Sequence, residues 1–219
     1  MDYAAARKWM VDGQLRPNKV TDSRIINAML DLPRHLFVPP GQAARAHADA
    51  DVPLGRDRVM LQPMMLARLL QLAQIRSGEA VLLLGAGTGY SAALLARLGA
   101  KVTAVENDPL LAAQARQVLA GLSLAPGSVQ LVEAPAAAGH AEDAPYDVIL
   151  IEGQVPAIPA ALTEQLAEGG RLVTIRQPPG RSGSAVLGRR LGGTLSVTEA
   201  FDCRTAPLPE FQKQPGFAL

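Results

Sequence analysis

The stretch Val81-Leu82-Leu83-Leu84-Gly85-Ala86-Gly87-Thr88-Gly89-Tyr90 decides the fold of this chain. Its unbroken apolar run is typical of a strand that is buried on both faces of a sheet. Three glycines at alternate positions follow, and residues 91–98 then place apolar side chains at helical spacing. A strand, a glycine turn and a helix in this order let a ligand approach backbone amides at a helix N-terminus. A tight turn without any ligand would use the same glycines, so the loop alone is a weak signal.

The spacing of the glycines favours one class of ligand over another. Dinucleotide-binding loops read Gly-x-Gly-x-x-Gly, whereas residues 85–89 read Gly-x-Gly-x-Gly, the form associated with S-adenosylmethionine. A nicotinamide-dependent oxidoreductase is therefore disfavoured. Glu106 ends the next predicted strand, about twenty residues after Gly85, where a carboxylate can accept hydrogen bonds from both hydroxyls of a ribose. The alternative interpretation is a solvated acid at the end of a strand.

Strands and helices alternate from residue 80 onward, which predicts an α/β fold with a doubly wound, mostly parallel sheet and helices on both faces. The predicted strands span residues 81–84, 101–105, 129–132, 147–151 and 171–175, and the predicted helices span 91–98, 109–122 and 159–167. Residues 184–190 and 194–201 flank Gly192-Gly193 and predict a C-terminal β-hairpin at the edge of the sheet.

The first part of the chain lies outside this alternation and reads as an N-terminal helical extension. Helices are predicted over residues 2–12, over a segment capped by Thr21 or Asp22, and over 64–72, where Pro63 begins the helix and Gly78 closes the segment. Residues 41–60 show no clear period and predict a loop with at most a short strand. We therefore divide the chain into residues 1–79 and an α/β domain over residues 80–219.

Composition narrows the function classes. The net charge of +1, with scattered Lys and Arg, argues against binding to nucleic acid or to an anionic membrane. Cys203 is the only cysteine, which excludes an internal disulfide, and the three histidines match no metal-binding spacing. The N-terminus shows no signal-peptide pattern. A soluble cytoplasmic protein without a bound metal is expected, and the oligomeric state is left open.

Further motifs lie on both sides of the glycine loop. They are Met10-Val11 with Gln14-Leu15, Ala28-Met29, Pro33-Arg34 with Phe37-Val38-Pro39, Ala46 with Asp49, Gln62-Pro63, Ala92-Ala93, Pro145-Tyr146-Asp147 and Gly169-Gly170-Arg171-Leu172-Val173. With them the chain resembles the protein-L-isoaspartate O-methyltransferases over nearly its whole length. The resemblance implies a Rossmann-like class I methyltransferase that uses S-adenosylmethionine to methylate a carboxylate of a protein or peptide, in protein repair. Residues 1–79 would then carry the acceptor-site segment.

The resemblance also implies a set of site residues. The cofactor would lie along the glycine loop with its ribose on Glu106, and the implied cofactor-binding residues are Gly85, Ala86, Gly87, Thr88, Gly89, Tyr90, Glu106, Asn107, Glu133 and Ala134. No residue is assigned a catalytic role, because a carboxylate acceptor is already ionised at neutral pH and needs no general base. Catalysis then consists mostly of aligning the reactants in a dry pocket.

The chain departs from the family pattern at several of these positions. Leu61 stands where the family has a Ser that positions the acceptor; the lost hydrogen bond is worth about 1.5–3 kcal/mol, or one to two powers of ten in rate. Leu83 and Ala134 replace family acids along the cofactor, and His47 replaces a Tyr. Losing two acids should weaken binding of the cationic methyl donor more than binding of neutral S-adenosylhomocysteine. A catalytically degenerate relative that acts as a binding or regulatory module is the alternative.

Three further candidates remain open. Glu152 follows the fourth predicted strand of the alternating region and could replace a lost acid or lie solvated in a loop. His140, in an Ala-rich segment, is expected at the surface. The charges at residues 56–58 (Arg56, Asp57 and Arg58) could include an arginine that grips an anionic acceptor, but a solvated cluster is favoured.

Overall fold

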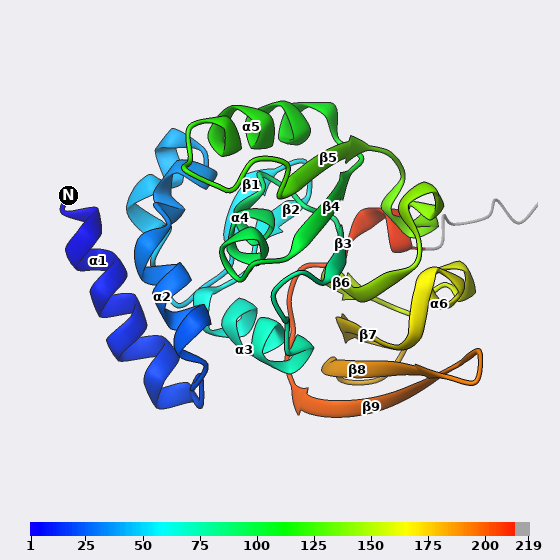
Figure 1. Cartoon of the computed structure of the whole chain (residues 1–219). Coiled ribbons are helices and arrows are strands. Elements are labelled where there is room, and N and C mark those ends of the chain that lie inside the picture. The colour runs from blue at the N-terminus through cyan, green and yellow to red at the C-terminus, as the bar shows by residue number, and fades with distance from the viewer. Residues whose placement is uncertain (213–219) are drawn as a thin grey trace, which may run out of the picture.

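The computed structural model describes residues 1–212, and a seven-stranded sheet forms its centre (Figure 1). The strands are β3 (Ala80–Leu84), β4 (Lys101–Glu106), β5 (Val129–Glu133), β6 (Tyr146–Val155), β7 (Leu166–Arg176), β8 (Ser184–Leu191) and β9 (Thr194–Asp202). They lie in the order β5-β4-β3-β6-β7-β8-β9; β3 to β7 are parallel, and β8 and β9 are antiparallel. The predicted mostly parallel sheet and C-terminal hairpin are confirmed.

Helices connect the parallel strands. They are α4 (Tyr90–Arg97), α5 (Pro109–Ala120) and α6 (Ala160–Gln165). The Asp108 carboxylate caps α5 by accepting hydrogen bonds from the amides of Leu110 and Leu111. Helix α6 is shorter than predicted because the chain already enters β7 at Leu166, whose buried side chain belongs to the core.

The N-terminal extension contains α1 (Tyr3–Met10), α2 (Ser23–Asp31) and α3 (Pro63–Ala73), and α1 and α2 lie together on one side of the molecule (Figure 1). Asp22, one of the two predicted caps, accepts a hydrogen bond from the Arg24 amide at the start of α2. The sequence had suggested that Gly78 closes the segment of α3. Instead, Gln74 ends the helix in a left-handed conformation. The segment predicted as mainly loop contains a small hairpin of β1 (Val52–Gly55) and β2 (Arg58–Met60).

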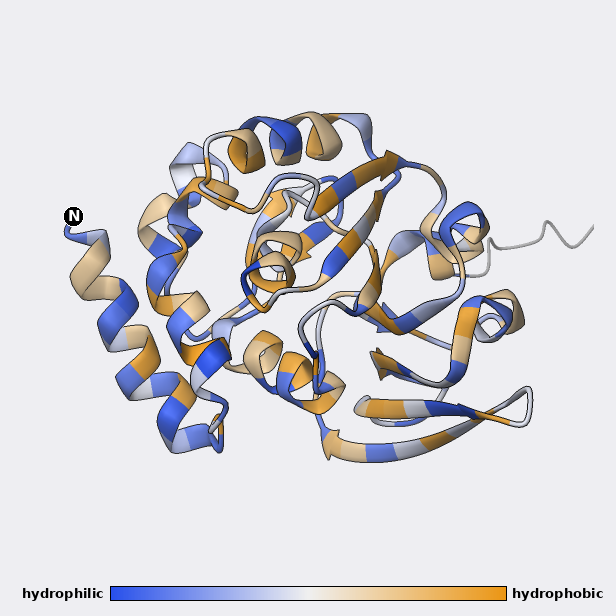
Figure 2. Cartoon of the chain, viewed as in Figure 1, coloured by the Kyte–Doolittle hydropathy of each residue, from blue (hydrophilic) through white to orange (hydrophobic). Residues whose placement is uncertain are grey.

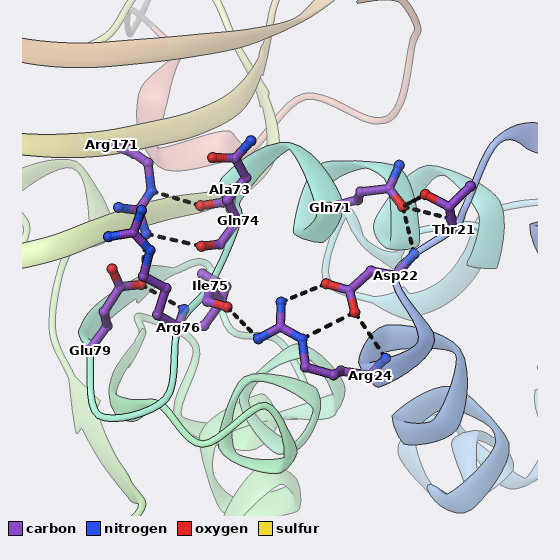
Figure 3. A network of polar contacts seen from close by, with 10 residues as sticks. All are labelled: Thr21, Asp22, Arg24, Gln71, Ala73, Gln74, Ile75, Arg76, Glu79 and Arg171. Atoms are coloured by element: carbon purple, nitrogen blue, oxygen red, sulfur yellow. Dashed lines mark hydrogen bonds and ion pairs between the residues drawn. The ribbon is translucent and has the colours of Figure 1, made fainter.

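Polar contacts fix α3 between the extension and the sheet (Figure 3). The Gln71 side chain accepts hydrogen bonds from the amides of Thr21 (2.7 Å) and Asp22 (3.1 Å), just before α2. Near the end of α3, the Arg24 guanidinium donates to the Ile75 carbonyl (2.9 Å), and Arg171 of β7 donates to the carbonyl of Ala73, the last residue of the helix (2.8 Å). These bonds tie the C-terminal part of α3 to α2 on one side and to β7 on the other.

Alternate residues of β3 enter two hydrophobic clusters on opposite faces of the sheet. Val81 and Leu83 belong to a large cluster that also contains α1, α2 and α3, whereas Leu82 and Leu84 belong to a second cluster with Leu208. The apolar residues gather on the strands and the inner helix faces, as the hydropathy colouring shows (Figure 2). Residues before and after position 80 thus share one core, and the division into residues 1–79 and 80–219 stays a prediction. Residues 213–219 of the second part lie outside the described residues.

Within residues 1–212, no helix combines the length and the hydrophobicity needed to cross a membrane. The same residues contain no cluster of His, Cys, Asp and Glu side chains suited to hold a metal ion.

Candidate cofactor site

The strand order reverses between β3 and β6, and this reversal positions the candidate site. From β3 the chain proceeds outward to β4 and β5 and then returns to β6 on the other side of β3. In open parallel sheets, ligands bind at the carboxyl ends of the strands at such a point. Gly85 directly follows β3, and Glu152 lies in the last part of β6. The sequence-predicted glycine loop therefore lies where this fold binds ligands.

The glycine loop has a backbone conformation that other residues rarely adopt. Gly85, Gly87 and Gly89 have φ angles of 76°, 55° and 90°. The amides of Gly85 and Ala86 both donate to the Val105 carbonyl at 3.0 Å, which fixes the loop to the end of β4. A side chain at Gly89 would lie 3.2 Å from side-chain atoms of α5, so this third glycine permits close helix packing.

Glu106 joins the loop to the end of β4 through its carboxylate. Its side chain is fully buried, and one oxygen accepts a hydrogen bond of 2.6 Å from the Gly87 amide. The other oxygen accepts from the Asp108 amide (3.0 Å) and from Nη1 of Arg58 (2.8 Å). The acid that the sequence assigned to a ribose therefore lies against the glycine loop, and its partners all come from the chain itself.

Arg58 is the unexpected member of this site. It begins β2, its side chain is 7% exposed, and Nη2 donates to the Gly85 carbonyl at 2.8 Å. The interpretation of residues 56–58 as a solvated charge cluster is therefore wrong for Arg58. It holds for Arg56, which is 54% exposed and pairs with Asp108 at 2.6 Å. The local sequence does not distinguish the two arginines, because the partner of Arg58 comes from a distant strand.

A buried polar cluster lies nearby and consists of Arg34, Tyr90, Ser91 and Glu152. Each of these side chains has a buried polar atom without a hydrogen-bond partner among residues 1–212: Nη1 of Arg34, the Tyr90 hydroxyl, Oγ of Ser91 and Oε2 of Glu152. The Arg34 guanidinium lies 4.7 Å from the centroid of the Tyr90 ring. Burial raises the pKa of Glu152 to about 7, although Ser91 and the cations Arg58 and Arg34 favour its charged form. Unsatisfied buried polar atoms of this kind fit a polar ligand.

Arg34 and Ser91 were not predicted as site residues. Arg34 lies in the Pro-Arg motif and donates from Nε to the Ala46 carbonyl (2.6 Å) and from Nη2 to the Leu61 carbonyl. The motif was the available signal, but nothing local showed that its arginine is completely buried. Leu61 itself is 1% exposed and packs in the large core cluster.

The other predicted residues have diverse surroundings. The Thr88 hydroxyl donates to the Phe37 carbonyl (2.5 Å), and the Tyr90 ring meets the Phe37 ring edge-on, so both residues attach the extension to the loop. Asn107 is exposed. Glu133 is 41% exposed and pairs with Arg116 of α5 at 2.5 Å, and Ala134 packs beside the second core cluster.

His140 had been expected at the surface, but its side chain is mostly buried. It is 13% exposed, and its Nε2 lies 3.3 Å from the Asp143 carboxylate.

The residues present fit a nucleoside cofactor. The positive-φ loop, the Glu106 carboxylate and the unsatisfied atoms of the buried polar cluster supply the required groups. Side chains of the hairpin and of the C-terminal segment cover the loop. A Cβ atom built on Gly87 would lie 3.2 Å from Leu54, and one on Gly85 would lie 3.0 Å from Leu208 and 3.1 Å from Arg58.

Comparison with known families decides the relationship. The sequence profile of the family described as "Protein-L-isoaspartate(D-aspartate) O-methyltransferase (PCMT)" matches residues 6–211. The chain belongs to this family. Within the PCMT family, it is 36% identical over 209 residues to protein-L-isoaspartate O-methyltransferase 1 of Pelobacter propionicus, covering 95% of this chain and 97% of the relative. It is 40% identical over 206 residues to the protein-L-isoaspartate O-methyltransferase of Koribacter versatilis, covering 94% and 91%.

Solved structures agree with this membership. One protein-L-isoaspartate O-methyltransferase superposes with a TM-score of 0.79 and 25% identity, covering 92% of this chain and 65% of that longer chain. A putative PCMT of Plasmodium falciparum, solved in complex with S-adenosyl-L-homocysteine, shares the fold with a TM-score of 0.76 at 16% identity, covering 95% and 98%. The resemblance and the class I methyltransferase fold expected from the sequence are confirmed.

Proposed function

We propose that this PCMT-family chain transfers a methyl group from S-adenosylmethionine to the carboxylate of an isoaspartyl residue in a protein or peptide. The observation that carries the proposal is the bond of 2.6 Å between the Gly87 amide and the Glu106 carboxylate at the reversal of strand order. It brings the two sequence signals of a cofactor site together at the carboxyl ends of β3 and β4. Family membership adds the reaction class.

The proposed cofactor site extends from the glycine loop to the end of β5. Gly85 to Tyr90 would lie along the cofactor, Glu106 and Asn107 at its ribose, and Glu133 and Ala134 near its adenine. When bound, the cofactor supplies an electrophilic methyl group on a cationic sulfonium. Glu152 can replace the negative charge that the family acid at position 83 would supply, because its buried carboxylate has an unpartnered oxygen within residues 1–212.

The proposed transfer moves no proton. With the cofactor bound, its methyl group would pass from sulfur to a carboxylate oxygen of the acceptor, which would leave a methyl ester and a neutral thioether. The protein then needs to orient the carboxylate and exclude water. Leu54 and Leu208 over the loop suit the exclusion of water. At position 61, Leu cannot donate the hydrogen bond of the family Ser, so a slower transfer by one to two powers of ten is expected.

Two measurements test the function. Calorimetric titration should show binding of S-adenosylhomocysteine and weaker binding of the cationic donor, because Leu83, Ala134 and the nearby Arg58 all disfavour a positive ligand. Methyl transfer should then occur to an isoaspartyl peptide and not to the same peptide with a normal aspartyl linkage. Failure of both ligands to bind at millimolar concentration would contradict the proposal. Binding without transfer would instead support the binding-module alternative.

The proposed partner is a protein or peptide carboxylate, and the proposed compartment is the cytoplasm. The near-zero net charge and the single cysteine support a substrate other than nucleic acid and a reducing environment.

A further inference from the structure

We infer that Arg58 sets the cofactor affinity of this chain: its guanidinium occupies the Glu106 carboxylate, and cofactor binding must displace it. This inference rests on the proposed function. Nη1 of Arg58 lies 2.8 Å from Glu106, Nη2 lies 2.8 Å from the Gly85 carbonyl, and both side chains are buried. A ribose on Glu106 would need the position that Nη1 holds.

The C-terminal segment, residues 205–211, covers the same path at two other points. Its Leu208 side chain lies over Gly85 and Gly153, and its backbone bonds to Gln154 of β6 through the Leu208 amide (2.9 Å). Further along, Oε2 of Glu210 accepts a hydrogen bond of 2.6 Å from the Ala136 amide, just after the residues assigned to adenine. Three side chains thus lie along the proposed cofactor path: Leu208 over the glycine loop, Arg58 on Glu106, and Glu210 next to the residues assigned to adenine.

Arg58 also links the two covering segments. Its Nη1 lies 3.9 Å from Oε1 of Glu210, so one guanidinium of β2 faces both Glu106 and a carboxylate of the C-terminal segment. A hollow of about 640 Å³ separates the hairpin from this segment and is lined by residues of both, among them Gly55, Arg58, Ala206 and Pro209. Movement of Arg58 toward this hollow would free Glu106 without disturbing the sheet.

Arg58 and the cofactor compete for the Glu106 carboxylate, and this competition lowers the cofactor affinity. A buried ion pair is costly to break when one partner is left alone, so Arg58 leaves only when another donor satisfies Glu106. If the cofactor binds only the form in which Arg58 is displaced, its apparent dissociation constant is the intrinsic constant divided by the population of that form. Removing the guanidinium should therefore tighten binding.

The test compares Arg58→Met with Arg56→Met by calorimetric titration with S-adenosylhomocysteine. Arg56→Met is a matched control because Arg56 lies on the same hairpin but is exposed and pairs with Asp108. We expect Arg58→Met to bind at least about tenfold tighter than the wild type, and Arg56→Met to bind like the wild type. Arg58→Gln, which removes the charge but keeps a polar side chain, should also tighten binding and serves if Arg58→Met does not fold.

Each contrary result has its own meaning. Weaker binding by Arg58→Met would show that Arg58 holds the cofactor, and equal binding would place it outside the path; either result overturns this inference and leaves the proposed function standing. If neither the wild type nor any of the variants binds at millimolar concentration, the proposed function fails together with the inference.

Discussion

Thr205 donates a hydrogen bond of 2.5 Å to the carboxylate of Asp51, which lies 154 positions earlier in the sequence. The other oxygen of Asp51 accepts from the Gln62 amide at 2.8 Å, directly before α3. One carboxylate therefore joins the approach to the β1–β2 hairpin, the start of α3 and the C-terminal segment. The two segments that cover the glycine loop are fastened at a shared point.

Replacing Thr205 by Val should loosen the C-terminal segment. The variant loses a hydrogen bond to a charged acceptor, and we expect the free energy of unfolding to fall by about 1.5–3 kcal/mol. Hydrogen exchange of the Leu208 amide, which bonds to Gln154, should accelerate. Thr198→Val on the exposed face of β9 is the matched control and should change neither quantity. Unchanged exchange in Thr205→Val would mean that the Asp51 bond does not hold the segment.

Glu106 should contribute to cofactor affinity once Arg58 no longer competes for it. In the Arg58→Met background, Glu106→Gln should weaken binding of S-adenosylhomocysteine by about tenfold to a hundredfold, because a charge-assisted bond is worth about 1.5–3 kcal/mol. Calorimetry measures the effect. Glu199→Gln, an exposed acid paired with Arg176, is the control in the same background. Equal affinities with and without Glu106→Gln would remove Glu106 from the ribose site.

Leu61→Ser tests whether position 61 limits turnover. The loss of buried apolar atoms should lower the free energy of unfolding by about 2–4 kcal/mol, while the new hydroxyl can donate to an acceptor carboxylate. We expect the rate of methyl transfer to an isoaspartyl peptide to rise per folded molecule. Leu61→Ala makes a similar cavity without a hydroxyl and should not show the gain. Equal rates in the two variants would show that a hydroxyl at this position does not orient the acceptor.

The raised pKa of Glu152 predicts a defined pH dependence of stability. Burial raises this pKa from 4.5 to about 7. Between these values the folded chain retains a proton that the unfolded chain has lost, so the contribution of Glu152 to stability falls as the pH rises through this window. Above pH 7 the loss is complete and constant.

Glu152→Gln should remove this dependence. The free energy of unfolding of the variant minus that of the wild type, measured in urea, should increase by about 3 kcal/mol as the pH rises from 4.5 to 7.5. His47, whose pKa burial lowers to about 4, titrates with the opposite sign but is present in both proteins and cancels in the difference. Glu142→Gln, at an exposed acid, should behave like the wild type. A pH-independent difference would show that folding does not raise the pKa of Glu152.

Local pattern was sufficient to predict the fold. An apolar run such as residues 81–84 can be stable only where both faces are buried, and alternation of such runs with helical periods leads to a parallel sheet. The same reasoning located the glycine loop and Glu106, because the positive φ angles and the strand end are properties of a short stretch. Element ends were less accurate: Gln74, and not Gly78, caps the C-terminus of α3, and β7 begins before the predicted strand.

The sequence by itself determined which groups a cofactor site can use, and the tertiary structure decided which of them are engaged. Arg56 and Arg58 look alike in the sequence, yet one is solvated and the other is buried on Glu106, 48 positions later. Likewise, the unsatisfied atoms of Arg34, Ser91 and Glu152 come together from separate elements. The physical reason is that burial of a charge or polar atom depends on partners that distant segments deliver, and local sequence patterns carry no information about such partners.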